Sequence, residues 1–188
     1  MSKVTIAGDA NGTGVFTIAA PNGNTNRTLT LPDATGTVLS TATPGVPIGG
    51  PAFSAYPNTT QTIASGTFTK VQVGVKVFDT ATAYDATTNY RFTPLVAGYY
   101  QVTAAWYCST TSGQVISAIY KNGVVYQATS AQAYNAGNVL GVNSLIYLNG
   151  STDYLEFYVY QAQGSSFVML AARPDLNYFQ AAMVRSAT

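Results

Sequence analysis

The stretch RFTPLVAGYYQVTAAW, residues 91–106, decides the fold of this chain. It packs four aromatic residues around a proline and a glycine, and Arg91 is its only charged residue. Tyr100 and Trp106 are an even number of positions apart, so a strand places both side chains on one face. Gly98 has no Cβ and lets the chain turn into that strand. We therefore expect a long strand with an aromatic face that begins near Gly98.

Alternation with a period of two continues beyond this strand, and no segment has a helical period. It occurs in whole or in part in TFTKVQVGVKVF, QVISAIY, VVYQAT, SLIYL, YLEFYVYQ and YFQAAMV. Asn122-Gly123 stands between two such segments and suits a two-residue type I′ turn, which needs positive φ at both positions. Asn149-Gly150 opens another connection. Residues 52–188 therefore predict an all-β, antiparallel jelly-roll sandwich.

Residues 1–40 differ in composition from the rest of the chain. Phe16 is their only aromatic residue, whereas the others lie beyond residue 51. Residues 41–51 are rich in Pro and Gly, which is typical of a semi-rigid linker. We interpret residues 1–40 as an extended β arm that gains order on copies of itself or on another protein, because its strands bury too little apolar surface alone. Its expected anchoring residues are Phe16, Ile18, Leu29, Leu31 and Val38.

Composition excludes several classes of function. Charged residues make up 8% of the chain and the net charge is +1, so capture of nucleic acid or an anionic membrane has no basis. The chain has no histidine, which removes the Ser-His-Asp and Cys-His nucleophiles and every imidazole metal ligand. Its carboxylates are scattered. We expect no catalytic residue, no metal and no cofactor. Cys108, the single cysteine, is expected to be a buried thiol.

Two carboxylates near the opening stretch leave an alternative open. Asp79 and Asp85 flank a loop, where they could hold calcium, as the family resemblance given below implies, or accept hydrogen bonds from backbone amides. The second interpretation is favoured because no run of alternating oxygen ligands accompanies them. Arg173-Pro174-Asp175 is likewise interpreted as a turn.

Tyrosines crowd the faces that a simple sandwich would leave in water. In YLEFYVYQ, one face carries Leu155, Phe157 and Val159, while the other carries tyrosines around Glu156. Such rings suit a subunit interface, although they could also line a solvated sheet. We predict a closed homo-oligomer, with an interface that contains Tyr100, Tyr154, Tyr158, Tyr160 and Tyr178.

Phe92, Gly98 and Tyr100, spaced F-x5-G-x-Y, resemble the signature of the C1q-like jelly rolls related to tumour necrosis factor. PAFSAY (residues 51–56) is similar to that family's first strand and YFQAAMV to its last. The resemblance implies a fold of about ten strands that assembles into homotrimers through an aromatic-rich sheet.

The arm segment IAAPNGNTNRTLTLPDATGTVLST resembles segments of bacteriophage fibre and virion-surface proteins. Together these resemblances imply a trimeric capsid decoration or cement protein of the head-fibre type. Its arm would bind the major capsid protein, and the chain would be made in the host cytoplasm and reside on the virion surface. The alternative is a short tail fibre or receptor-binding tip, in which Tyr134 stacks on a host-surface glycan. A polysaccharide depolymerase is a third, less favoured reading.

Overall fold

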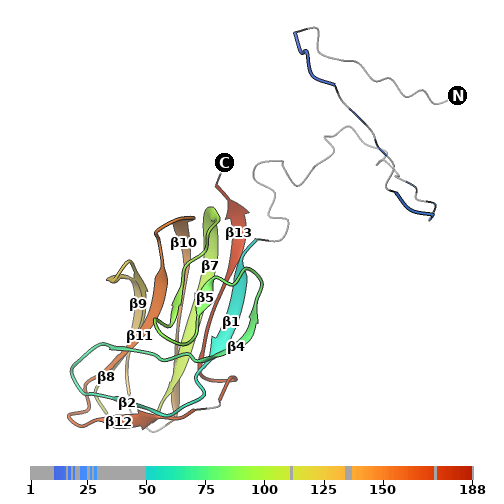
Figure 1. Cartoon of the computed structure of the whole chain (residues 1–188). Helices are drawn as coiled ribbons and strands as arrows, with labels where there is room; N and C mark the ends of the chain where they lie inside the picture. Colours follow the sequence, from blue (N-terminus) through green and yellow to red (C-terminus); the bar gives the residue numbers. More distant parts are fainter. Residues whose placement is uncertain are drawn as a thin grey trace, which may run out of the picture. The chain divides into compact units, whose positions relative to one another are not determined.

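The structure is a computed structural model. It describes residues 50–110, 112–133, 137–171 and 173–187, and before them residues 11–15, 17, 19, 22–24, 26 and 28. The chain divides into two units, Met1–Val38 and Leu39–Thr188. In the second unit the described residues form strands and no helix, as Figure 1 shows. No helix in the described part of the chain is long and apolar enough to cross a membrane.

Five strands form one layer, which we call sheet I, in the spatial order β10-β7-β13-β1-β4. All neighbours in sheet I are antiparallel. The bounds of its strands are β1 (Ala52–Tyr56), β4 (Val75–Asp79), β7 (Ala97–Cys108), β10 (Asn138–Asn149) and β13 (Tyr178–Ser186).

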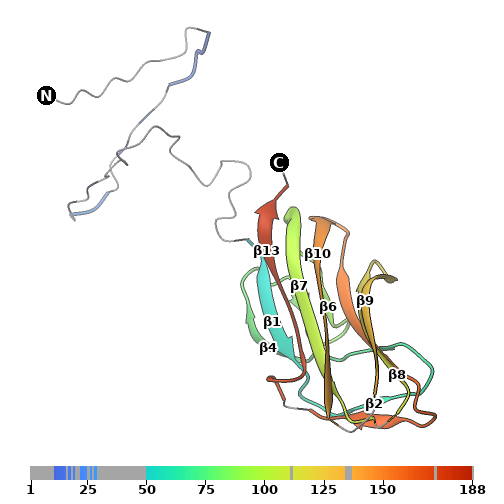
Figure 2. The same cartoon turned by 180° about the vertical axis from the view of Figure 1, so that it is seen from behind.

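The second layer, sheet II, has the order β5-β6-β11-β8-β9, and β3 also pairs with β11. Its strands are β3 (Thr69–Lys70), β5 (Tyr84–Asp85), β6 (Arg91–Phe92), β8 (Gln114–Lys121), β9 (Val124–Gln132) and β11 (Leu155–Gln161). A separate pair, β2 (Gln61–Ile63) with β12 (Phe167–Met169), closes one end of the sandwich (Figure 2). The predicted antiparallel jelly-roll sandwich is confirmed.

Aromatic rings fill the space between the sheets. Phe53 of β1 lies at their centre: its ring centroid is 4.4 Å from that of Tyr84, 4.6 Å from Phe92 and 5.0 Å from Phe179. Phe92 also packs edge-on against Tyr100 at 5.6 Å. The rings thus join β5 and β6 of sheet II to β1, β7 and β13 of sheet I. Tyr100 and Trp106 share one face of β7, as their even spacing predicted, and both are fully buried.

Gly98 has a different role from the one expected. It lies inside β7 and is not among the residues with positive φ. A Cβ at this position would lie 2.5 Å from the carbonyl oxygen of Arg185 on β13. Glycine is therefore needed because β13 approaches closely where its register with β7 shifts, between Met183 and Arg185.

The run TFTKVQVGVKVF, which alternates strictly over residues 71–77, is divided between the two layers. β3 pairs with β11 in sheet II, whereas β4 pairs with β1 in sheet I. The chain crosses between them at residues 71–74, where Val71 and Val73 are each 1% exposed and fill the core.

The Asn122-Gly123 turn is confirmed, with φ of 54° and 79° at the two residues. Asp153 fixes it from the neighbouring Asn149 turn. Its carboxylate accepts hydrogen bonds from the Asn122 side-chain amide at 2.7 Å and from the Asn149 backbone at 3.0 Å. It also pairs with Lys121 at 3.0 Å. The two Asn-Gly turns are thereby tied together at one end of the sandwich.

Candidate assembly interface

The face of sheet I that points away from the core is uncharged over most of its area. β1, β7 and β10 contain no Asp, Glu, Lys or Arg. In β4, Lys76 pairs with Asp79 at 3.2 Å, and in β13 the only charge is Arg185, near its end. Large apolar side chains on this outer face remain between 42% and 55% exposed: Phe78, Tyr99, Val139, Leu145, Tyr147 and Val184.

Strand register gathers these side chains into rows across the outer face. Tyr147 of β10 lies directly opposite Tyr99 of β7, with ring centroids 5.5 Å apart. In the next row, Leu145 lies opposite Gln101. Exposed apolar side chains that form a contiguous surface are typical of a protein-protein contact. Single scattered ones occur on most protein surfaces and have no such meaning.

A pocket of about 270 Å³ opens on the same face, over β1, β4, β7 and β13. Phe78 and Ala182 form part of its lining, and Gln101, Thr103 and Gln180 contribute amide and hydroxyl groups. Ser54 lies next to it and donates a hydrogen bond to the Gln180 side-chain oxygen at 3.4 Å.

One lateral side of the sandwich is formed by two long edge strands, β9 and β10, which lie next to each other (Figures 1 and 2). Neither contains a charged residue or a proline. In β9, residues 124–130 are exposed on both faces of the strand. Natural edge strands are commonly protected by charge, proline or shortness. We call β9 and β10 together the bare edge. The other edge strands, β4 and β5, are short.

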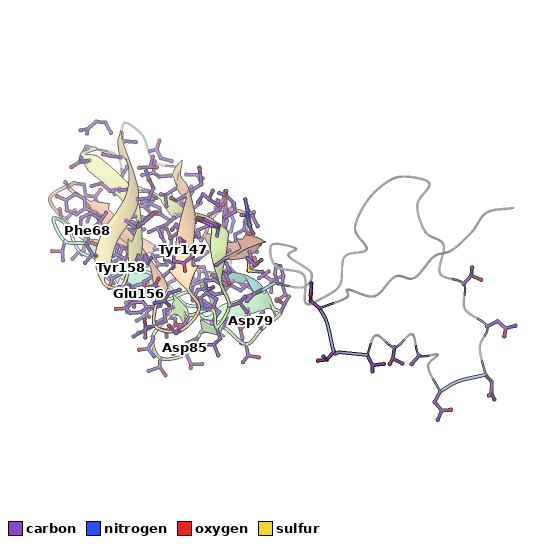
Figure 3. All side chains as sticks on the ribbon, turned by 90° about the horizontal axis from the view of Figure 1, so that it is seen from above. Phe68, Asp79, Asp85, Tyr147, Glu156 and Tyr158 are labelled. Atoms are coloured by element: carbon purple, nitrogen blue, oxygen red, sulfur yellow. The ribbon has the colours of Figure 1, made fainter. Side chains whose placement is uncertain are left out.

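The tyrosine face of β11 is covered in part by the chain's own residues. Tyr158 stacks on Tyr120 with centroids 4.0 Å apart. Phe68 packs against Tyr120 at 5.9 Å and against Tyr160 at 5.3 Å. Phe68 and Tyr158 are labelled on this face in Figure 3. These rings form a small second cluster over Ala118, which is fully buried although it lies opposite Tyr158.

Charged groups lie among these rings. Glu156, with a side chain 4% exposed, pairs with Lys70 at 2.7 Å and with Arg91 at 3.8 Å. Arg91 in turn lies over the Tyr154 ring, 4.4 Å from its centroid. Because interface cores are depleted in charged residues, this face is a poorer candidate for self-association than the outer face of sheet I.

The structure separates the five tyrosines predicted for one interface. Tyr154, Tyr158 and Tyr160 lie on the outward side of sheet II, and Tyr178 lies on the outer face of sheet I, in register with Ala105. The prediction for Tyr100 is wrong. It is 0% exposed and donates a hydrogen bond to the Val96 carbonyl at 2.7 Å, and burial raises its pKa to about 12.

The predicted anchoring residues Phe16, Ile18, Leu29, Leu31 and Val38 lie outside the described residues, as does Tyr134. Sequence reasoning did not identify the bare edge, or Tyr99, Leu145 and Tyr147. The sequence did contain a signal for this surface. Residues 97–108 and 138–149 carry no charge, although alternation should leave one face of each of these long strands in water.

The carboxylates flanking the loop at 79–85 accept hydrogen bonds from backbone amides, as favoured. Asp79 accepts from Ala83 and Tyr84 at 3.0 and 3.1 Å. Asp85 accepts from Thr87, Thr88 and Asn89, each at 3.0 Å. The described residues contain no group of three His, Cys, Asp or Glu residues that could hold a metal ion. Cys108 is buried, as expected.

These hydrogen bonds predict the response of stability to acid. The backbone amides of Thr88 and Thr87 hold the pKa of Asp85 well below its usual range. A carboxyl group whose pKa is lower in the folded state stabilises the fold above its unfolded pKa of about 3.9, and that contribution is lost as the pH falls further. We therefore expect the free energy of unfolding to drop between pH 5 and pH 2.5, and to drop less in Asp85→Asn, when followed by urea denaturation.

The matched control is Asp175→Asn. Asp175 binds Arg173 at 2.9 Å, but the pair is exposed, and water screens it. Its removal should leave the acid sensitivity close to that of the wild type. An Asp85→Asn variant as acid-sensitive as the wild type would show that the Asp85 cap does not contribute.

The fold and its surfaces define a jelly-roll sandwich whose sheet I has a mostly uncharged outer face. No protein-family model matches the chain, and no curated protein matches it. Solved structures do. Murine APRIL, solved at pH 5.0, has a TM-score of 0.57 and 10% identity, covering 73% of this chain and 99% of that one.

The PRD1 vertex protein P5 has a TM-score of 0.50 at 18% identity, covering 72% of this chain and 73% of that one. The globular domain of zebrafish complement 1qA protein has a TM-score of 0.48 at 17% identity, covering 73% and 99%. The likeness to APRIL and to the PRD1 protein shows the tumour-necrosis-factor-like jelly-roll fold that the Phe92-Gly98-Tyr100 signature indicated.

Proposed function

We propose that this protein is a structural component of a bacteriophage virion surface, a homotrimeric capsid decoration or cement protein held on the capsid by residues 1–40. The observation that carries the proposal is the pairing of an uncharged, ring-rich outer face on sheet I with the bare edge of β9 and β10. The proposal needs no catalytic group. The name of the PRD1 protein, a vertex protein, supports the virion location.

Two unlike surfaces favour a ring over a two-fold dimer. If the bare edge of one subunit packs on the outer face of sheet I in the next, the contact is heterologous, and such contacts close into rings when the rotation allows. The resemblance to C1q-like domains favours three subunits. The outward side of sheet II, with Tyr154, Tyr158 and Tyr160, would then remain on the outside of the ring.

Both ends of the jelly roll leave the sandwich together. Pro51, just before β1, accepts a hydrogen bond from the Met183 amide at 3.0 Å, and Ala187 donates to the Ala97 carbonyl at 2.9 Å. In a ring, the three arms would therefore emerge on one side. Three linked arms bind a repeating surface far more tightly than one, because each bound arm raises the effective concentration of the others.

The arm proposal is tested by decorating virus particles that lack the protein. We expect the full-length variant Leu29→Ser/Leu31→Ser to remain a trimer but to lose at least about tenfold in occupancy, since two apolar side chains on each of three arms are replaced. Thr28→Ser/Thr30→Ser, which the alternation of the sequence predicts to lie on the opposite side from the leucines, is the control and should bind normally. Occupancy is measured by cryo-electron microscopy of the particles.

Wild-type occupancy by Leu29→Ser/Leu31→Ser would remove these residues from the anchor. The position of the density separates the two candidate functions. Density on the capsid supports decoration, whereas density at the tail alone would favour the receptor-binding tip. In that case the segment between β9 and β10, which contains Tyr134, becomes the place to search for a bound host glycan.

A further inference from the structure

The pocket on the outer face of sheet I has a mixed lining. Phe53 and Ala181, whose side chains face the core, form its floor, the methyl group of Ala182 adds an apolar side, and Phe78 gives it an aromatic wall. Gln101, Thr103 and Gln180 add hydrogen-bonding groups, with no charge among them. A fitting occupant is therefore flat, apolar over most of its surface, uncharged, and able to exchange a hydrogen bond at one end. A tyrosine side chain has this chemistry.

The bare edge offers such a side chain. Tyr126 of β9 is 48% exposed, between Val125 at 45% and the exposed Gln127. It is the extra residue at the register shift in the β8–β9 pairing, because Tyr120 lies opposite Val125 and Ile119 opposite Gln127. Bulges of this kind redirect a side chain at the edge of a sheet. No aromatic ring of the described residues packs on Tyr126.

Tyr126 cannot fill the pocket of its own subunit. β9 is hydrogen-bonded to β8 in sheet II, whereas the pocket opens on the far side of sheet I, over β1, β4, β7 and β13. A Tyr126 side chain that fills this pocket would therefore belong to a second copy of the chain. Both surfaces are uncharged, so no ion is left unpaired when they meet.

We propose that Tyr126 of one subunit inserts into this pocket on the next subunit, where its hydroxyl group meets Gln101, Thr103 or Gln180. The inference rests on the proposed homotrimer and names the contact that fixes its register. The bare edge then supplies a ring to each neighbour in turn, and three such contacts close the assembly.

Disulfide trapping tests the contact directly. The full-length double variant Tyr126→Cys/Gln180→Cys introduces two exposed cysteines, and the native Cys108 is fully buried. A disulfide forms only where two Cα atoms approach within about 4.4–6.8 Å. Under mild oxidation to completion, we expect a covalent trimer on a non-reducing gel. Tyr126→Cys/Tyr158→Cys, which places the second thiol on sheet II, is the control and should remain uncross-linked.

A second variant guards against an unfavourable disulfide geometry. Ala182→Trp fills the pocket from β13 and should shift the protein to monomers in sedimentation. Thr62→Trp, on the exposed position of β2, should not. Covalent dimers alone would indicate a two-fold contact and overturn the ring. A wild-type trimer with neither cross-linking nor disruption by Ala182→Trp would overturn the pocket contact alone. A monomeric wild type would overturn the proposed trimer itself.

Discussion

Leu145→Asp is expected to convert the proposed trimer into folded monomers of 19.7 kDa. Leu145 is 55% exposed in the single chain, so a carboxylate there is harmless to the fold of one subunit. In the ring it would be buried three times without a free cation, because the neighbouring β7 has no charged residue and Lys121, near Tyr147, already pairs with Asp153. An unpaired buried charge costs several kcal/mol, roughly 3–5 for each one left without a partner. Sedimentation velocity measures the change.

Tyr158→Asp is the matched control on the other sheet. Tyr158 is half-buried and lies on the outward side of sheet II, which stays outside the proposed ring, so a carboxylate there keeps its contact with water. We expect this variant to sediment like the wild type. The opposite pattern, with Tyr158→Asp monomeric and Leu145→Asp trimeric, would place the interface on sheet II, as the tyrosine pattern of the sequence first suggested.

Phe53→Ala is expected to lower the free energy of unfolding by about 3–5 kcal/mol, the range for removing a fully buried phenylalanine. The expected loss of stability is large because the Phe53 ring stacks on Tyr84 and Phe92 and packs edge-on against Phe179. The loss would leave a cavity where β1 of sheet I faces β5 and β6 of sheet II. Urea denaturation followed by tryptophan fluorescence measures the effect, since Trp106 is the only tryptophan.

The free energies of unfolding with and without Phe53→Ala are best compared in the Leu145→Asp background, because assembly raises the apparent stability by mass action. Phe78→Ala on the adjacent strand is the control. Phe78 is 49% exposed, so its truncation should cost less than about 1 kcal/mol. Equal losses at Phe53 and Phe78 would contradict the assignment of Phe53 to the centre of the core.

Features that depend on neighbouring residues were predictable. The Asn122-Gly123 turn, the amide caps at Asp79 and Asp85, and the core face of β11 with Leu155, Phe157 and Val159 all follow from short-range geometry. Alternation assigns side chains to the two faces of a strand. Asn-Gly marks the position of a turn because a type I′ turn needs positive φ at both residues. Neither feature depends on which strands pair with each other.

The sequence by itself therefore determined an all-β chain, its turns and the alternating faces of its strands. Only the tertiary structure decided which faces are covered. It divided one alternating run between two sheets, buried Tyr100, and used Phe68, Lys70 and Arg91 to cover the tyrosines of β11. It also left β9 and β10 as a bare edge. An alternating sequence shows only that a strand has two unlike faces. What packs against each face is determined by pairing between residues more than a hundred positions apart, such as Ala52 with Ala182.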